Sequence, residues 1–243
     1  MGEGPPLVLL HGYVGTGGAT WRPQLEGLSD AFTVIAWDGP GTGGSDDPPG
    51  SFGMADFADR LAEFIDELGL ERPHVGGISF GGALALELYR RHPEIPRTLI
   101  LVSAYAGWAG SLPPDEVDRR LNQVLDLADL PPERFVSAVE PTMFEGATPP
   151  DFLATLPDFH PVGLRAMARA VAEADLRDVL PQVDVPTLLL YGAGDVRAPR
   201  EVAEAIHAGI PRSRLVYLPA GHICNIEAAD RFNSELRAFL QEA

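Results

Sequence analysis

Short apolar runs recur along the chain and alternate with amphipathic stretches. The runs are continuous, whereas a strand with one face in water would alternate between apolar and polar residues. The candidate strands are Leu7–Leu10, Thr33–Trp37, His74–Gly76, Thr98–Ser103, Thr187–Tyr191 and Arg214–Leu218. Continuous runs are typical of strands buried on both faces, so the pattern predicts a parallel sheet with helices on either side.

Helical periodicity fills the stretches between these runs. One helix is indicated by apolar residues that recur every three or four positions, at Met54, Phe57, Ala58, Leu61, Ile65 and Leu68. Gly82–His92 reads as a second helix that ends before Pro93, and Ala229–Leu240 repeats the same period near the C-terminus. The fold class is therefore predicted to be α/β, with a mostly parallel sheet flanked by helices.

Residues 106–180 break the alternation of strands and helices. This stretch contains helical patterns and many prolines but no convincing strand, and it is too long for a simple loop. We interpret it as a helical insertion that covers one end of the sheet as a lid. On this interpretation residues 1–105 and 181–243 form the core, and 106–180 form the lid.

The charge of the chain excludes several kinds of partner. Its 35 acidic and 18 basic residues give a formal net charge of −17, which disfavours nucleic acids and anionic membrane surfaces. All basic residues are arginine, so chemistry that needs a lysine amine, such as a Schiff base or a P-loop, is excluded. We expect a small-molecule substrate, no nucleic acid and no membrane partner, and the sequence predicts no particular oligomeric state.

Cysteine content and hydropathy bear on the compartment. Cys224 is the only cysteine, so an internal disulfide and a CxxC-type zinc site are excluded. No signal peptide is visible, and no apolar stretch approaches the length of a membrane span. The expectation is a cytoplasmic protein.

The strongest local motif is Gly77-Ile78-Ser79-Phe80-Gly81, which has the G-x-S-x-G form. It follows a candidate strand and precedes a candidate helix. A serine on such a sharp strand-to-helix turn is held exposed above the sheet, and flanking glycines avoid collisions with the closely packed backbone. This context predicts that Ser79 is a nucleophile, whereas a purely structural turn is the less favoured reading.

A second motif, His11-Gly12-Tyr13, ends the first strand. Gly12 allows the backbone to approach a substrate oxygen, so the backbone N–H groups of Tyr13 and Phe80 are the candidate oxyanion hole. His11 is expected to hold this loop and not to take part in chemistry.

The partners of Ser79 must come from later strands. Asp195 follows the strand Thr187–Tyr191, and His222 lies in a glycine-flanked loop after the strand Arg214–Leu218. Ligands bind at this edge of a parallel sheet. We therefore predict His222 as the general base and Asp195 as the acid that orients it, in the chain order Ser, Asp, His.

Aromatic residues and methionines near these positions are candidates for a substrate pocket of mostly apolar character. Most such side chains simply pack helices onto the sheet, but some are expected to face the nucleophile. The candidates are Trp21, Tyr105, Trp108, Met143, Phe144, Phe159 and Met167.

From Leu7 to its C-terminus the chain resembles the lid-bearing α/β-hydrolase superfamily. The resemblance rests on His11-Gly12, on Asp38-Gly39-Pro40-Gly41 with Gly44-Ser45-Asp46, on the Ser79 motif, and on the Asp195 and His222 loops. Within the superfamily the chain is most similar to 3-oxoadipate enol-lactonases and related carboxylesterases. Members usually carry a β-hairpin before the His-Gly strand, whereas only Met1 to Pro6 precede it here, so we expect the first two strands to be missing, by natural shortening or by truncation.

The resemblance implies a serine hydrolase that cleaves carboxylic esters or small lactones through an acyl-enzyme on Ser79. It implies no metal and no organic cofactor. Two alternatives share the same residues, namely a carbon–carbon bond hydrolase and a cofactor-free perhydrolase or haloperoxidase. An alternative of another class is a ligand-binding receptor with slow turnover.

Overall fold

In residues 1–154, 156 and 160–243, which a computed structural model describes, six strands form one sheet in the order β2-β1-β3-β4-β5-β6. Every neighbouring pair is parallel. The strands are β1 (Pro6–Leu10), β2 (Thr33–Trp37), β3 (His74–Ile78), β4 (Thr98–Val102), β5 (Thr187–Gly192) and β6 (Ser213–Leu218). The predicted α/β class with a parallel sheet is confirmed.

Burial separates the inner strands from the edges of the sheet. Nearly all residues of β1, β3, β4 and β5 are buried, because helices cover both of their faces. The edge strands β2 and β6 are only partly buried, although their sequences are equally continuous in apolar residues. An edge strand has a neighbour on one side only, so the sequence pattern overstates its burial.

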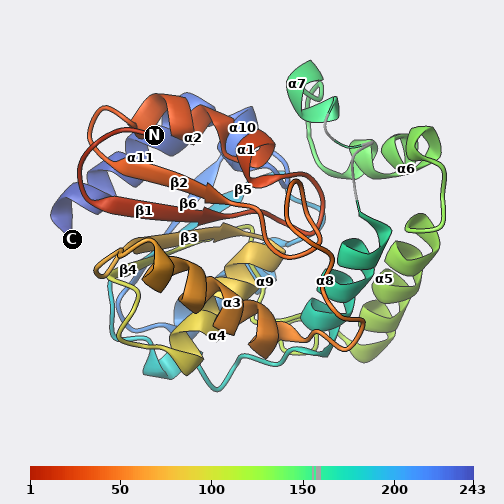
Figure 1. The fold of residues 1–243 in the computed structure, drawn as a ribbon, viewed down its shortest axis with the longest axis horizontal. Coiled ribbons are helices and arrows are strands. Elements are labelled where there is room, and N and C mark those ends of the chain that lie inside the picture. The colour runs from red at the N-terminus through yellow and green to blue at the C-terminus, as the bar shows by residue number, and fades with distance from the viewer. Residues whose placement is uncertain (155, 157–159) are drawn as a thin grey trace.

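Helices cover the two faces of the sheet (Figure 1). One face carries α3 (Met54–Glu67), α4 (Phe80–Arg91) and α9 (Arg200–Gly209), and the other carries α1 (Gly17–Thr20), α2 (Arg22–Leu28), α10 (Cys224–Glu227) and α11 (Ala229–Glu242). The apolar stripe of α3 is buried, as its periodicity predicts. In contrast, α4 begins two residues earlier than expected, directly after Ser79, because the strand passes into the helix without a loop.

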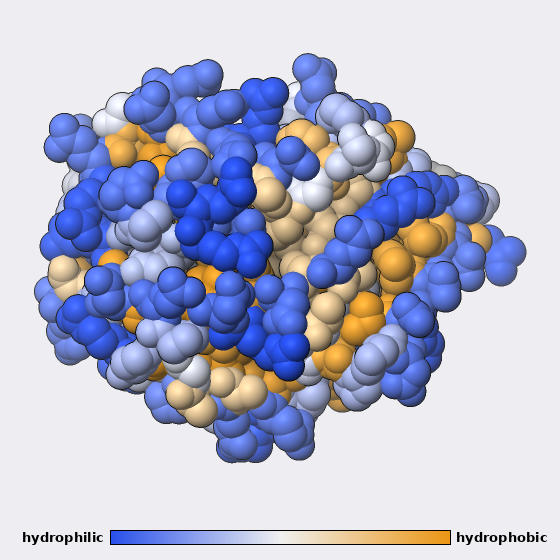
Figure 2. Space-filling model, turned by 90° about the horizontal axis from the view of Figure 1, so that it is seen from below, coloured by the Kyte–Doolittle hydropathy of each residue, from blue (hydrophilic) through white to orange (hydrophobic). Residues whose placement is uncertain are grey.

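The stretch between β4 and β5 is helical and lies beside the core, on the right of Figure 1. It contains α5 (Pro114–Leu127), α6 (Pro132–Val139), η1 (Glu140–Thr142), α7 (Pro150–Leu153), α8 (Pro161–Glu173) and η3 (Leu180–Gln182). Helix α8 packs between α5 and the core helices α3 and α4. The face shown in Figure 2 is mostly hydrophilic, and apolar residues show on the side where α5 and α8 lie.

None of the helices in the described part of the chain combines the length and apolar composition that a membrane span requires.

His74, at the start of β3, is buried although it is polar. Its Nδ1 lies 2.8 Å from the Thr98 hydroxyl, and its ring packs edge-to-face against Phe32. Burial, together with the charge of Arg97, lowers the pKa of His74 from 6.5 to about 4. The imidazole is therefore neutral in the folded protein at neutral pH.

This lowered pKa predicts how stability depends on pH. Between about pH 6.5 and pH 4 the unfolded chain binds a proton that folded His74 does not, so stability is lost as pH falls through this range. The loss from this group is up to about 1.4 kcal/mol per pH unit. Urea unfolding from pH 7 to pH 4 should therefore give a shallower decline for His74→Gln than for the unchanged protein. The exposed His207 is the control, and an equal effect of His207→Gln would contradict the assignment.

Candidate active site

Ser79 occupies the turn between β3 and α4 in a strained backbone conformation. Its φ is +54° and its ψ is −112°, which a residue with a side chain rarely adopts. Two glycines make the turn possible. A Cβ at Gly77 would lie 2.0 Å from the carbonyl oxygen of Gly81, and a Cβ at Gly81 would lie 2.4 Å from that of Leu10. The close approach of these backbones holds the Ser79 side chain at the carboxyl edge of the sheet.

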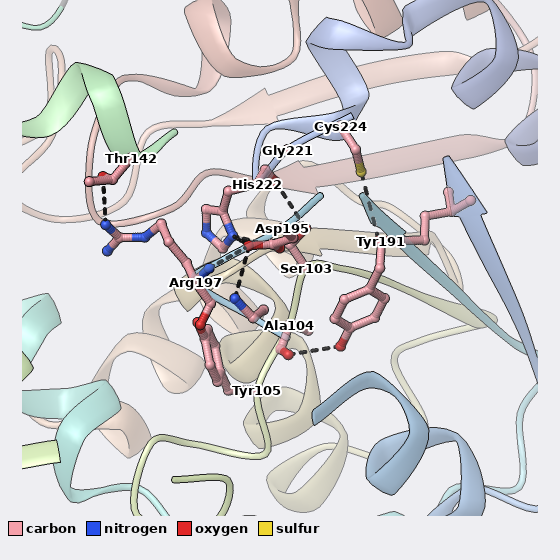
Figure 3. A network of polar contacts seen from close by, with 12 residues as sticks. Ser103, Ala104, Tyr105, Thr142, Tyr191, Asp195, Arg197, Gly221, His222 and Cys224 are labelled. Atoms are coloured by element: carbon pink, nitrogen blue, oxygen red, sulfur yellow. Dashed lines mark hydrogen bonds and ion pairs between the residues drawn. The ribbon is translucent and has the colours of Figure 1, made fainter. Parts of the chain in front are cut away.

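Two other candidate residues are hydrogen-bonded to each other at this edge. The Nδ1 of His222 lies 2.9 Å from Oδ2 and 3.1 Å from Oδ1 of Asp195. Oδ1 also accepts the backbone N–H groups of Arg197, at 2.8 Å, and Ala198, at 2.9 Å. Figure 3 shows the carboxylate of Asp195 between the imidazole and these groups. The imidazole is further fixed because the Ser103 hydroxyl donates to the His222 carbonyl oxygen at 2.9 Å.

The environment of Asp195 keeps it ionised. Burial alone would raise the pKa of this carboxyl, but the charge and hydrogen bond of His222 and the N–H groups of Ala198 and Arg197 outweigh burial. The net direction is downward. A buried carboxylate beside Nδ1 of an imidazole favours the tautomer in which Nδ1 carries the proton and Nε2 is free to act as a base.

Ser79 and His222 line one cavity, which we call the inner cavity. Gly12, Tyr13 and Met143 are among its other walls. Gly12 lies close to the nucleophile, because a Cβ built on it would be 3.8 Å from the Ser79 Cβ. In the described part of the chain the N–H groups of Tyr13 and Phe80 have no acceptor, and Phe80 is the first residue of α4. Both groups are thus available to a ligand oxygen.

His11 holds the loop that carries Tyr13. Its Nε2 accepts the Gly39 N–H at 3.1 Å, so Nδ1 carries the proton and donates to the Gly12 carbonyl oxygen at 2.5 Å. Burial lowers the pKa of His11, which is consistent with a neutral ring. Asp38 supports the same region by accepting the Gly17 N–H at 2.6 Å.

A second cavity adjoins the first between the core and the helices α5 and α6; we call it the outer cavity. Tyr13, Val14, Met143 and Arg197 line both cavities. The remaining wall is mostly apolar and includes Val124, Leu127, Phe135, Val139 and Leu164. A substrate that reaches Ser79 through the inner cavity can therefore extend into a larger space.

Of the predicted pocket residues that the structure describes, Met143 is the one that lines the two cavities. Phe144 packs edge-to-face against Phe152. Phe159 lies outside the described residues.

The other four predicted pocket residues are placed differently from expectation. Trp21 is buried against Phe232 of α11, and Met167 is buried in α8. Tyr105 and Trp108 lie behind the cavity wall, where Trp108 packs edge-to-face on Tyr13 and Tyr105. Most large side chains in these segments are buried against other core residues. The periodicity of the sequence does not reveal which of them line a cavity.

Arg197 is a site residue that the sequence reasoning missed. Its guanidinium donates to the Thr142 hydroxyl at 2.9 Å and to the Tyr13 hydroxyl, and it lies over the Tyr13 ring. Figure 3 shows the side chain extending from the Asp195 loop to Thr142. The sequence feature that could have indicated this role is a charged residue two positions after the candidate acid Asp195.

Glu227 was also missed. Its carboxylate accepts the N–H groups of Gly221 at 2.7 Å, Gly146 at 2.5 Å and Glu145 at 3.2 Å. It thereby joins the loop of His222 to the inserted segment. No local pattern identifies this role, because its donors come from segments far apart in the sequence.

Comparison with known proteins places this geometry in a family. The model of the alpha/beta hydrolase family matches residues 7–235. The chain is 31% identical to the carbamate hydrolase RutD of Cronobacter turicensis, over 97% of this chain and 91% of that protein.

Solved structures agree with the family match. A thermophilic esterase from Thermogutta terrifontis, solved with malate bound, is 30% identical and superposes with a TM-score of 0.90, covering 100% of this chain and 91% of that one. An enol-lactonase from Burkholderia xenovorans LB400 is 27% identical, with a TM-score of 0.84 and coverage of 98% and 92%. The chain belongs to the α/β-hydrolase family and is a hydrolase.

Proposed function

We propose that the protein is a serine hydrolase that cleaves carboxylic esters or small lactones through an acyl-enzyme on Ser79. The observation that carries this proposal is one cavity lined by a strained serine and by a histidine whose Nδ1 is bonded to a buried carboxylate. This arrangement supplies a nucleophile, a base and a group that orients the base.

In the proposed mechanism His222 Nε2 takes the proton of Ser79 as Oγ attacks the ester carbonyl carbon. The tetrahedral intermediate collapses, the bond to the leaving oxygen breaks, and His222 returns its proton to that oxygen. Water then attacks the acyl-enzyme with His222 again as base. The products are a carboxylic acid and an alcohol, or a hydroxy acid from a lactone, and Ser79 regains its proton.

The Tyr13 and Phe80 N–H groups are the proposed oxyanion donors. Neither group has an acceptor within the described structure. Phe80 follows Ser79 in the sequence, and Tyr13 follows Gly12, where a Cβ would lie 3.8 Å from the Ser79 Cβ. Donors that are already in place where charge develops cost no reorganisation during the reaction, and one of them is typically worth roughly 3–4 kcal/mol.

Residues 106–180 act as the lid in this proposal. Their helices α5 and α6 supply most of the outer cavity wall, while the core supplies the nucleophile and base. An outer cavity walled in this way favours small or medium acyl groups, because its apolar wall extends over only a few side chains.

The names of relatives support attack on a carbonyl carbon that bears a heteroatom leaving group. The relatives include an esterase, an enol-lactonase and a protein named as a carbamate hydrolase. Carbamates are therefore the second candidate substrate class. Carbon–carbon bond hydrolysis, perhydrolysis and ligand binding with slow turnover would use the same residues. The bromoperoxidase structures similar to this chain are less than 25% identical to it, so they support only the fold.

The identity of the nucleophile is tested with a fluorophosphonate probe. The probe should label Ser79, because no other serine of the described residues lines the inner cavity. Ser79→Ala should remove nearly all hydrolysis of p-nitrophenyl butyrate without changing the circular dichroism spectrum. Ser137, exposed on α6, is the matched control, and Ser137→Ala should keep full activity. Labelling mapped to another serine would refute the assignment.

The role of Asp195 is tested by Asp195→Asn. The amide cannot hold the Nδ1–H tautomer, so kcat should fall by about 10³- to 10⁴-fold while the fold is kept. Asp126→Asn, an exposed change on α5, is the control. Stopped-flow and steady-state assays at pH 8 measure the loss, and a decrease of less than about tenfold would argue for another acid.

The size of the acyl group is tested with p-nitrophenyl esters. The kcat/KM for the butyrate should exceed that for the palmitate by roughly tenfold or more, because the apolar wall of the outer cavity extends over only a few side chains. A palmitate preference would contradict the lid proposal and leave the nucleophile assignment intact.

A further inference from the structure

The wall of the outer cavity has an unusual charge. Arg119, Arg120 and Arg197 line it, and no aspartate or glutamate is among the lining residues in the part of the chain that the structure describes. The protein as a whole carries a formal net charge of −17. Among the described residues the charged groups on this wall are all positive, which in so acidic a chain indicates a negatively charged ligand.

The three arginines differ in how far their charge is already compensated. Arg119 and Arg120 both bond to the carboxylate of Glu116, with Nε to oxygen distances of 2.7 Å and 2.5 Å. Arg120 also donates to the Tyr105 hydroxyl and to the Arg197 carbonyl oxygen. Two cations therefore share one anion, and their net effect on the cavity is positive.

Arg197 has no carboxylate partner within the described structure. The acceptors of its side chain are the neutral hydroxyls of Thr142 and Tyr13. These two bonds leave other N–H groups of the guanidinium without an acceptor among the described residues. Because Arg197 lines both cavities, its free donors are within reach of a ligand that extends from Ser79 into the outer cavity.

The nearby acids are engaged elsewhere. Asp195 is occupied by His222 and by backbone N–H groups, including that of Arg197 itself. Glu227 accepts three backbone N–H groups. Neither side chain is among those that line the cavities, so neither would contact an anion bound there.

We propose that Arg197 binds a carboxylate at the far end of the substrate while the ester or lactone carbonyl lies at Ser79. This inference rests on the proposed hydrolase function and narrows its substrate class to half-esters of short dicarboxylic acids. The planar guanidinium suits a carboxylate because it can donate two parallel hydrogen bonds. The reaction at Ser79 is unchanged, and Arg197 determines specificity.

The test compares an anionic and a neutral methyl ester of the same length, monomethyl glutarate and methyl pentanoate, in a pH-stat assay. The unchanged protein should prefer monomethyl glutarate. In Arg197→Gln the ratio of the two kcat/KM values should fall by about 10- to 100-fold, the effect of losing one charged hydrogen-bonded partner. Arg197→Lys should restore part of the ratio, because it keeps the charge and loses the planar fork.

A control and a binding measurement separate the possible failures. Arg134→Gln, an exposed change on α6 away from the cavity wall, should keep the ratio. Equal losses on both esters in Arg197→Gln would show that Arg197 only ties Thr142 to Tyr13, and this would overturn the inference. A ratio near one in the unchanged protein, with active ester hydrolysis, would overturn it as well and leave the proposed function standing.

Calorimetric titration of Ser79→Ala with glutarate reports on the same site without turnover. Binding that is lost in the double variant Ser79→Ala, Arg197→Gln supports the inference even if methyl esters prove to be poor substrates. Absence of glutarate binding to Ser79→Ala would overturn the inference, whereas failure of fluorophosphonate labelling would count against the proposed function alone.

Discussion

The site depends on the parallel arrangement of buried strands, because it brings their carboxyl ends to a single edge. The loops after β1, β3, β5 and β6 begin there and carry Tyr13, Ser79, Asp195 and His222. The strained backbone of Ser79 is kept by the same packing. Helix α4 starts so close to β1 that a Cβ at Gly81 would collide with a β1 carbonyl oxygen. The cost of such strain, of order 1–3 kcal/mol, is borne by the burial of the surrounding strands.

Backbone N–H groups organise the carboxylates around this edge. Asp195 is held by two of them in addition to His222, and Glu227 is held by three that come from two separate segments. Hydrogen bonds from a fixed backbone need no rearrangement when charge moves, so the orientation of the imidazole is set before a substrate arrives. Glu227 adds a connection between the His222 loop and the inserted helices, which links the shape of the outer cavity to the position of the base.

Charge acts on two length scales in this protein. The acidic surface contributes to a field that salt screens beyond a Debye length of about 8 Å at physiological ionic strength. The arginines of the outer cavity act at short range, in a partly buried space where screening is weaker. An anion that enters the outer cavity therefore interacts mainly with Arg197 and Arg120, and the net negative charge of the whole chain has less effect on it. This separation allows an acidic protein to contain a site suited to an anion.

The sequence by itself determined the α/β architecture, the approximate limits of its strands and the positions of Ser79, Asp195 and His222 at strand ends, because each of these depends on local patterns of apolar residues, glycines and polar residues. Tertiary structure alone decided that Trp21 and Trp108 are packed away from the cavities, and that Arg197 and Glu227 join the site. Each of these four residues has at least one partner far away in the sequence. Which side chain faces an opening depends on how helices pack in space, and local periodicity carries no information about that packing.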